Sequence, residues 1–359
     1  MRLSAILLAC ATLGVSTSSL AYQFPTPEDP RARAVLERVG MDTAKFDALL
    51  AFAKPAPQAW SCEAPIAYLY QPAGIVDAVP ADQLPADVKA QLEDGKRMMR
   101  KTFRAQGLDP SAAMVTTTSD IELIPISAPC KNGKLDGPVE YYLAFKQVME
   151  SNMETFSPLT NKLEKNRTLM NSQAEMVVRQ TYVAGKPAHG VRIARRGSIT
   201  SRMTYENPQI QKSVDDSLAK TGSLNRATPQ KTVSVNDEKT VTVFSLLEEP
   251  KVTGGVFGVN TEWQRKLSTM VMLNDPGVQV SYTYSDAQPL AVMRQNRETS
   301  TSEMISYMDN FVKKMGKKIS DMPGMENYRE MVIGGRDVLE MRTCSIDFKP
   351  VKMDPCPVE

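Results

Sequence analysis

Few side chains in this sequence are of types that do chemistry, and histidine is the scarcest of them. His189 is the single histidine among 359 residues, so any serine–histidine or cysteine–histidine catalytic system would have to use it. It lies in the segment Gly185–Gly190, whose glycines and proline are typical of a turn between strands. The count also excludes a metal site built from several histidines. We therefore predict that His189 is solvated and has no catalytic role.

A serine and a lysine match part of the catalytic pattern of penicillin-recognising serine enzymes. Ser217 and Lys220 have the S-x-x-K spacing, but Lys220 is also the first residue of the K-T-G sequence that those enzymes place on a distant strand. One lysine cannot occupy both positions, so we reject this hypothesis. The adjacent Asp215 and Asp216 tend to point apart in regular structure, whereas acid–base pairs need facing carboxyl groups. We predict no catalytic residue, no cofactor-binding residue and no cofactor.

Four cysteines, Cys62, Cys130, Cys344 and Cys356, follow the first 21 residues. An even number of cysteines in an oxidising compartment favours disulfide bonds over free thiols. We favour the pairs Cys62–Cys130 and Cys344–Cys356, because cysteines that are near in sequence meet more often; the other two pairings stay open. Zinc is the competing hypothesis, but it would require closely spaced cysteine pairs, and the sequence has none. We predict no metal ligands.

Methionine is the one unusual feature of the composition, with 21 in the chain. Ser300 and Glu303 form a capping box, which predicts an amphipathic helix over 300–319. Its apolar face would carry Met304, Met308, Phe311 and Met315, together with Ile305, Val312 and Ile319. We expect this helix to cover a sheet and to offer a flexible apolar face. Three alternatives stay open: core packing of the methionines, a helix on a membrane surface, and binding of Cu(I), for which Met322 and Met325 are candidates.

The first 21 residues have the pattern of a cleavable secretory signal. Arg2 supplies a positive charge, Leu3–Val15 is uncharged and mostly apolar, and the small residues Ser19 and Ala21 fit a signal-peptidase site. We predict cleavage after Ala21 and a periplasmic or secreted mature protein. The apolar run is shorter than the roughly 20 residues of a membrane-spanning helix, and no later segment is long enough. The mature protein is expected to have no transmembrane span.

Composition and charge indicate a globular protein without a nucleic-acid partner. Hydrophobic residues make up 42% of the chain and charged residues 23%, which is ordinary for a folded domain. The formal net charge is +2, which gives no electrostatic reason to expect nucleic acid. We interpret the local basic run of Arg192, Arg195 and Arg196 as a solvated strand face.

Helices are expected in the N-terminal region, residues 22–110. The first predicted helix, 29–40, begins with an Asp-Pro cap and ends at a glycine. A second begins at Thr43 and is stopped by Pro55, and a third extends over 86–106, where apolar residues recur with helical spacing.

The region 111–359 has the pattern of antiparallel strands, because short apolar–polar alternations recur between turn signals rather than between helices. Hairpin turns are expected at 236–239, 274–277 and 334–335. The polar stretches 151–172 and 207–230 are expected to be long loops. The chain is thus predicted to be an α+β protein, with N-terminal helices followed by a mainly antiparallel sheet and the one covering amphipathic helix.

Two segments resemble the β-hairpin repeats of the membrane occupation and recognition nexus (MORN) family. Residues 132–142 contain Asn-Gly-Lys-Leu-Asp-Gly followed by Tyr141 and Tyr142, similar to the glycine turn and aromatic strand of such repeats. Residues 182–190 match more loosely, with one extra residue between their glycines. The resemblance implies a hairpin scaffold used for binding or architecture rather than for a reaction.

These features together predict an exported, non-enzymatic binding or scaffold protein with an unidentified partner. The first alternative is a carrier that holds an apolar ligand between the sheet and the helix at 304–319. The second alternative is a hydrolase that depends on carboxylates or on a serine. Replacing one Asp, Glu or Ser would abolish turnover only in the hydrolase.

Overall fold

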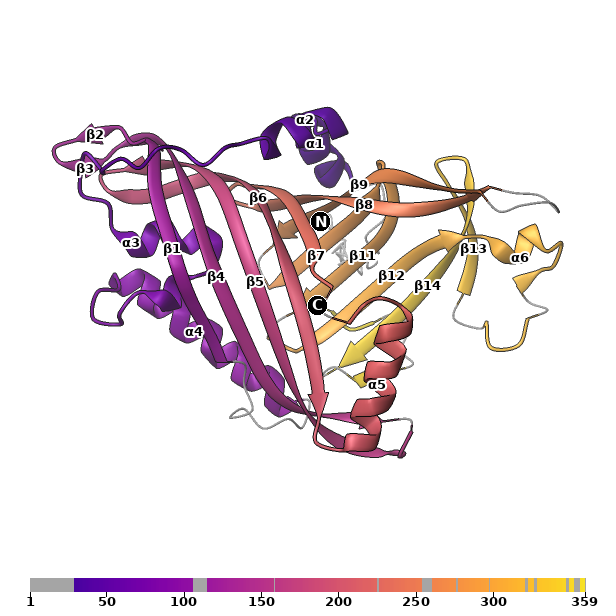
Figure 1. Cartoon of the computed structure of the whole chain (residues 1–359). Helices are drawn as coiled ribbons and strands as arrows, with labels where there is room; N and C mark the ends of the chain where they lie inside the picture. The colour runs from indigo at the N-terminus through magenta and orange to yellow at the C-terminus, as the bar shows by residue number, and fades with distance from the viewer. Residues whose placement is uncertain are drawn as a thin grey trace, which may run out of the picture.

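A single curved antiparallel sheet dominates the computed structural model (Figure 1). The structure describes residues 29–105, 115–157, 159–224, 226–253, 260–275, 277–296, 298–319, 322–325, 328–346, 349–351 and 356–358. The strand order is β1-β4-β5-β6-β7-β8-β9-β10-β11-β12-β14-β13, and β15 pairs with β14. Neighbouring strands are antiparallel and mostly consecutive in the chain. The protein is therefore mainly an antiparallel sheet of hairpins with few helices.

The adjacent strands β4, β5 and β6 are the longest of the sheet. The strands are β1 (Val115–Ser127), β4 (Gly137–Ser157), β5 (Lys162–Val183), β6 (Lys186–Tyr205), β7 (Thr228–Asn236), β8 (Thr240–Thr253), β9 (Asn260–Asn274), β10 (Val278–Ser285), β11 (Gln288–Asn296), β12 (Thr301–Asp309), β13 (Tyr328–Ile333), β14 (Arg336–Ile346) and β15 (Lys349–Val351), with β2 (Cys130–Lys131) and β3 (Lys134–Leu135) in a separate small sheet. Three connections, β7–β8, β9–β10 and β13–β14, fall at the predicted hairpin turns.

Helices are concentrated in the N-terminal part of the described chain. They are α1 (Pro30–Val39), α2 (Thr43–Leu50), α3 (Ile66–Tyr70), α4 (Ala86–Ala105), α5 (Pro208–Lys220) and α6 (Phe311–Lys314), with the short 3-10 helices η1 (Gln71–Ala73) and η2 (Val76–Ala78). The Asp29 side chain accepts a hydrogen bond from the backbone N–H of Arg31 (2.8 Å), and Gly40 ends α1 at a φ of 52°. These are the predicted caps of the first helix.

The two predicted long loops are not loops. β4 and β5 pair from Gly137–Tyr182 as far as Ser157–Lys162, so strands occupy most of 151–172. The polar residues there were misleading, because a strand needs backbone pairing more than apolar side chains. In the other stretch α5 begins at Pro208, where the Asn207 side chain caps it by accepting a hydrogen bond from Gln209 N (3.1 Å).

The predicted helix over 300–319 is also wrong. The chain forms strand β12 over 301–309 and then the single turn α6, and Ser300 has a φ of 53° instead of capping a helix. Met304 and Met308, four residues apart, share a face in a helix and in a strand alike. Pairing with β11 over residues 301–306 and with β14 over residues 301–309 gives most backbone groups of β12 a partner, and this outweighs the local helical preference.

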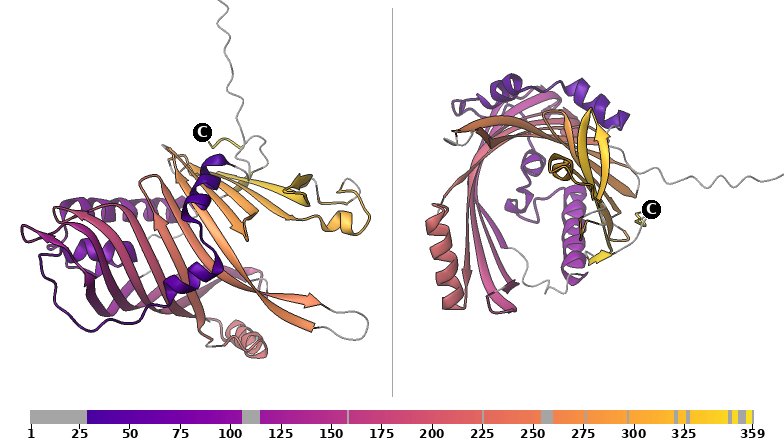
Figure 2. Two further views of the ribbon diagram at one scale, coloured as in Figure 1. Left: turned by 90° about the horizontal axis from the view of Figure 1, so that it is seen from above. Right: turned by 90° about the vertical axis from the view of Figure 1, so that its right-hand side faces the viewer.

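The helices pack on both faces of the curved sheet and form separate cores. α1 and α2 lie on its outer face, where Val35 and Phe46 belong to a core with apolar side chains of β7 to β14 (Figure 2). α3 and the beginning of α4 lie on the inner side, where Leu69 and Val88 belong to a core with residues of β4 and β5. Alternate residues along each strand therefore point to the outer core and to the concave side of the sheet, which we call the hollow.

α4 lies on the concave side of the sheet (Figure 2), and residues near both of its ends contact other parts of the protein. Its first turn is held by buried Val88 and by Asp87, which accepts a hydrogen bond from the Tyr68 hydroxyl (3.0 Å). Near its last turn, Lys101 Nζ donates to the carbonyl oxygen of Glu298 between β11 and β12 (3.0 Å). The helix thus links the two halves of the sheet from within.

Gly95 lies in the middle of α4, where an added Cβ would meet no atom within 4 Å. In an exposed helix interior, alanine is more favourable than glycine by about 1 kcal/mol. We expect Gly95→Ala to raise the free energy of unfolding by about 0.5 to 1 kcal/mol, as measured by urea denaturation. A variant no more stable than the wild type would show that α4 is not part of the cooperative unit.

Candidate ligand-binding face

Methionine side chains gather on the inner face of the second half of the sheet. We call Met270, Met272, Met293, Met304, Met308 and Met341 the methionine band. Residues paired across neighbouring strands share a face, so the register places these side chains together. Met293 pairs directly with Met304, and Ser281 of β10 lies between Met272 and Met293. The residues that alternate with the band, such as Ile305, belong to the outer core. The band therefore faces the hollow.

The centre of the band is exposed although β11 and β12 are both paired with strands on their two sides. Met293 is 37% exposed and Met304 is 42% exposed. The α4 residues Met98 and Met99 are also exposed, at 41% and 45%. Large apolar side chains that remain accessible together usually mark a binding surface. The inner face is thus the candidate site of this protein.

The buried carboxylate side chains of β12 and β14 lie on the opposite, outer face of the sheet. Glu303 and Glu340 are 3% and 2% exposed on the outer side of β12 and β14. Arg342 Nε donates to Glu340 Oε1 (2.5 Å), and Arg294 Nη1 lies 3.9 Å from Glu303 Oε2. On the inner side, the positions between methionines are taken by Ser281, Thr283, Ala291, Ser302 and Ser306. An uncharged face of this kind suits an apolar ligand.

Two of the four residues predicted to form an apolar face belong to the band. Met304 and Met308 lie four residues apart on β12 and point to the hollow. Phe311 begins α6 and Met315 is the residue after it; both are exposed, at 40% and 52%. The sequence therefore indicated the right methionines on the wrong element, and the band residues of β9, β11 and β14 were not singled out.

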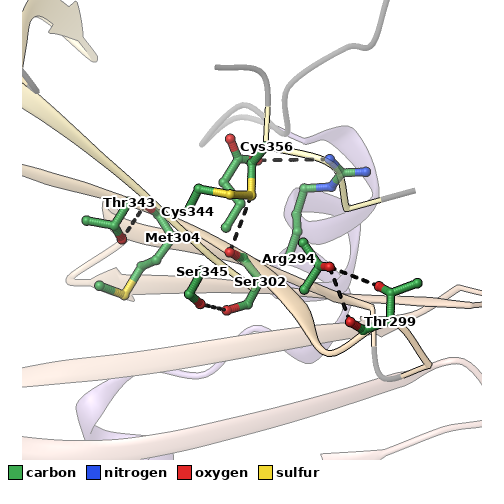
Figure 3. The surroundings of a disulfide bond; sticks show 10 residues. Arg294, Thr299, Ser302, Met304, Thr343, Cys344, Ser345 and Cys356 are labelled. Carbon is green, nitrogen blue, oxygen red and sulfur yellow. Dashed lines mark hydrogen bonds and ion pairs between the residues drawn. A yellow bond between two sulfur atoms is a disulfide. The ribbon is translucent and has the colours of Figure 1, made fainter. Parts of the chain in front are cut away.

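The predicted cysteine pairs lie at disulfide-bonding distance. The Cα atoms of Cys62 and Cys130 are 5.9 Å apart, and those of Cys344 and Cys356 are 5.5 Å apart. The second pair attaches the C-terminal segment to β14, and Cys356 Sγ lies 3.5 Å from the carbonyl oxygen of Ser302 (Figure 3). Fully buried Val358 follows it. This disulfide fixes the chain at the back of the band.

An ion pair on the outer face fixes the end of α2 to the sheet. Arg196 Nε donates to Glu175 Oε1 (2.6 Å), and its guanidinium lies 4.3 Å from the Phe52 ring. It also donates to the Leu50 carbonyl oxygen (3.1 Å). The Tyr142 hydroxyl donates to the other oxygen of Glu175 (2.9 Å). The Arg196 hydrogen bond lowers the pKa of Glu175, and burial together with Glu175 raises the pKa of Tyr142 to about 12.

A groove of about 910 Å³ surrounds this cluster, and most of its charged side chains form ion pairs. Lys54 lies 2.7 Å from Glu122, and Lys146 lies 2.9 Å from Asp120. Each of these two cations has a carboxylate partner, as Arg196 does; Lys231 also lines the groove. We assign the outer groove a structural role.

The residues considered for catalysis do not come together. His189 is exposed on β6, while Ser217 and Lys220 lie on one short helix, α5. Among the described residues, no group of three or more His, Cys, Asp or Glu side chains could hold a metal ion.

The two MORN-like segments contact each other through their turns. Gly185 N donates to the Leu135 carbonyl oxygen (2.8 Å), and Ala184 N donates to Asp136 Oδ2 (3.1 Å). Gly133 and Gly185 have φ values of 74° and 82°, which the residues of a tight turn require. The contact joins the β2–β3 hairpin to the β5–β6 connection.

Comparisons with known proteins give no indication of what this protein does. The sequence matches no protein-family model and no curated protein, and the fold matches no solved structure. None of the helices that the structure describes is long and apolar enough to cross a membrane.

Proposed function

We propose that this chain is an exported, non-enzymatic binding protein that carries an apolar ligand on the inner face of its sheet. The observation that carries this proposal is the exposure of Met293 and Met304, 37% and 42%, on β11 and β12, which are both paired with strands on their two sides. The ligand would lie between the methionine band and α4, in place of the predicted site against a helix at 304–319.

Methionine is well suited to such a face. Its side chain is unbranched and flexible, and its thioether is polarisable, so a methionine surface can adapt to ligands of different shape. The serine and threonine side chains between the methionines are small and uncharged. Contact with hydrocarbon would therefore release water without burying an unpaired charge.

An extracytoplasmic location agrees with the two cysteine pairs, because disulfides persist in oxidising compartments. The predicted signal at 1–21 and its cleavage after Ala21 lie outside the described residues. The resemblance of 132–142 and 182–190 to MORN hairpins is a further reason to expect binding rather than catalysis.

A dye titration tests the proposal. We expect N-phenyl-1-naphthylamine, an uncharged dye that fluoresces in apolar surroundings, to bind the purified mature protein. Met304→Glu would place a carboxylate in the middle of the methionine band. Because burying an unpaired charge beside the dye costs more than about 1.4 kcal/mol, binding should weaken at least tenfold.

Val148→Glu is the matched control. Val148 is 39% exposed on the outer face of β4, so the same substitution there changes charge and not the band. Dye affinity should equal that of the wild type. Absence of dye binding by the wild-type protein, or equal binding by Met304→Glu, would contradict the carrier proposal and favour a protein scaffold or a hydrolase.

A further inference from the structure

A partly buried arginine, Arg195, lies on the inner face of the sheet. Arg195 of β6 pairs with Met176 of β5 and Thr232 of β7, which places it on the inner side. Its guanidinium carbon lies 5.9 Å from the centroid of the Phe145 ring, a member of the inner core. Within the described part of the chain no carboxylate contacts it. Partial burial lowers its pKa, and no neighbouring charge opposes that effect.

The neighbouring Arg196 has a structural role, and its partners differ from those of Arg195. Arg196 points to the outer face and has a carboxylate, a carbonyl oxygen and an aromatic ring as partners. For Arg195, the Phe145 ring is the one partner that the described residues provide. Burying half of a guanidinium without an anion costs free energy. Arg195 nevertheless lies beside uncharged inner-face residues such as Ile193 and Ser234.

An uncharged path leads from Arg195 to the methionine band. A row of residues paired strand to strand begins at Ile193, two positions from Arg195 on the same face. The row continues through Ser234, Val243, Met270, Thr283, Ala291, Ser306 and Met341. Met270 is three strands from Ile193, or roughly 14 Å at the usual strand spacing.

We propose that Arg195 binds the carboxylate of a long-chain fatty acid whose hydrocarbon chain follows this row to the methionine band. The proposal rests on the proposed carrier function and names its ligand class. A guanidinium offers two parallel N–H donors that match a carboxylate, and partial burial strengthens such a pair. A partly buried cation at one end of an uncharged row of side chains matches a ligand with a charge at one end. An uncharged ligand would leave Arg195 without an anion.

Displacement of the dye by two ligands of equal chain length tests this inference. Palmitate carries a carboxylate and hexadecanol does not. For the wild-type protein, palmitate should displace the dye at a concentration at least tenfold lower than hexadecanol. Arg195→Gln and Arg195→Met should each reduce palmitate affinity about ten- to hundredfold and leave dye and hexadecanol binding unchanged. Arg195→Met retains the contact with Phe145, so loss of charge is tested without loss of packing.

Arg202→Gln is the matched control, because Arg202 lies on the same strand, is exposed and points to the outer face. It should not alter palmitate affinity. If the dye binds but both Arg195 variants bind palmitate as the wild type does, the fatty-acid inference is overturned and the carrier proposal stands. If the dye does not bind the wild-type protein, both are overturned.

Discussion

Replacing Gly197 with alanine is expected to reduce the free energy of unfolding by about 3 kcal/mol, at the upper end of the cost of overpacking. Gly197 of β6 pairs with Ala174 of β5. An ideal Cβ at Gly197 would overlap the carbonyl oxygen of Gln173 and lie 3.1 Å from the Cα of Ala174. These are backbone atoms, which cannot rotate away as a flexible side chain would. The β5–β6 pairing must therefore shift locally.

Urea denaturation followed by circular dichroism measures this effect. Ser198→Ala, at the next position on β6, removes a polar atom without adding volume and should change stability by less than about 0.5 kcal/mol. Gly95→Ala is the same chemical change in α4 and should have the opposite sign. A Gly197→Ala protein with the wild-type midpoint would show that β5 and β6 are less closely paired than the structure indicates.

Removing the Cys62–Cys130 disulfide is expected to cost about 4 kcal/mol, the largest loss from any single cross-link in this chain. The two cysteines are 68 residues apart, and a long closed loop restricts the unfolded chain more than a short one. The bond also ties the segment before α3 to the β2–β3 hairpin. Cys62→Ser/Cys130→Ser should therefore loosen the inner core, including the start of α4.

The second disulfide supplies the matched comparison. Cys344 and Cys356 are 12 residues apart, so Cys344→Ser/Cys356→Ser should lose only about 3 kcal/mol. Urea unfolding of both double variants beside the oxidised wild type gives the two losses. Equal losses, or a greater loss for the short loop, would contradict the chain-entropy argument and point to native packing around Cys356 as the larger contribution.

Local signals in the sequence were sufficient where the structure is itself local. Asp29, Pro30 and Gly40 bracket α1 because caps act within one turn of a helix. Hairpin turns at 236–239 and 334–335 were recognisable because adjacent strands pair directly across them. The cysteine pairs followed from proximity in sequence in the same way.

Long-range pairing is what the sequence did not show. Residues 301–309 contain apolar positions that fit a helix. They form strand β12 because they pair with β11 and β14, which a local sequence pattern does not reveal. Arg195 and Arg196 were interpreted as one solvated patch, but the strand sends them to opposite faces with different partners. The methionine band is assembled from four strands, β9, β11, β12 and β14, so no short segment of the sequence contains all of its residues.

The position of α1 has a consequence for the order in which the chain folds. The Asp29 carboxylate accepts a hydrogen bond from the Tyr282 hydroxyl (2.8 Å), and Val35 shares a core with Val271. When α1 leaves a ribosome or a translocation channel, it must therefore wait for partners more than two hundred residues further along the chain. Until β9 and β10 emerge, the outer core cannot close, and its apolar surface is open to water and to other chains. During synthesis the apolar residues of the outer core are thus exposed to aggregation until the last third of the chain has been made.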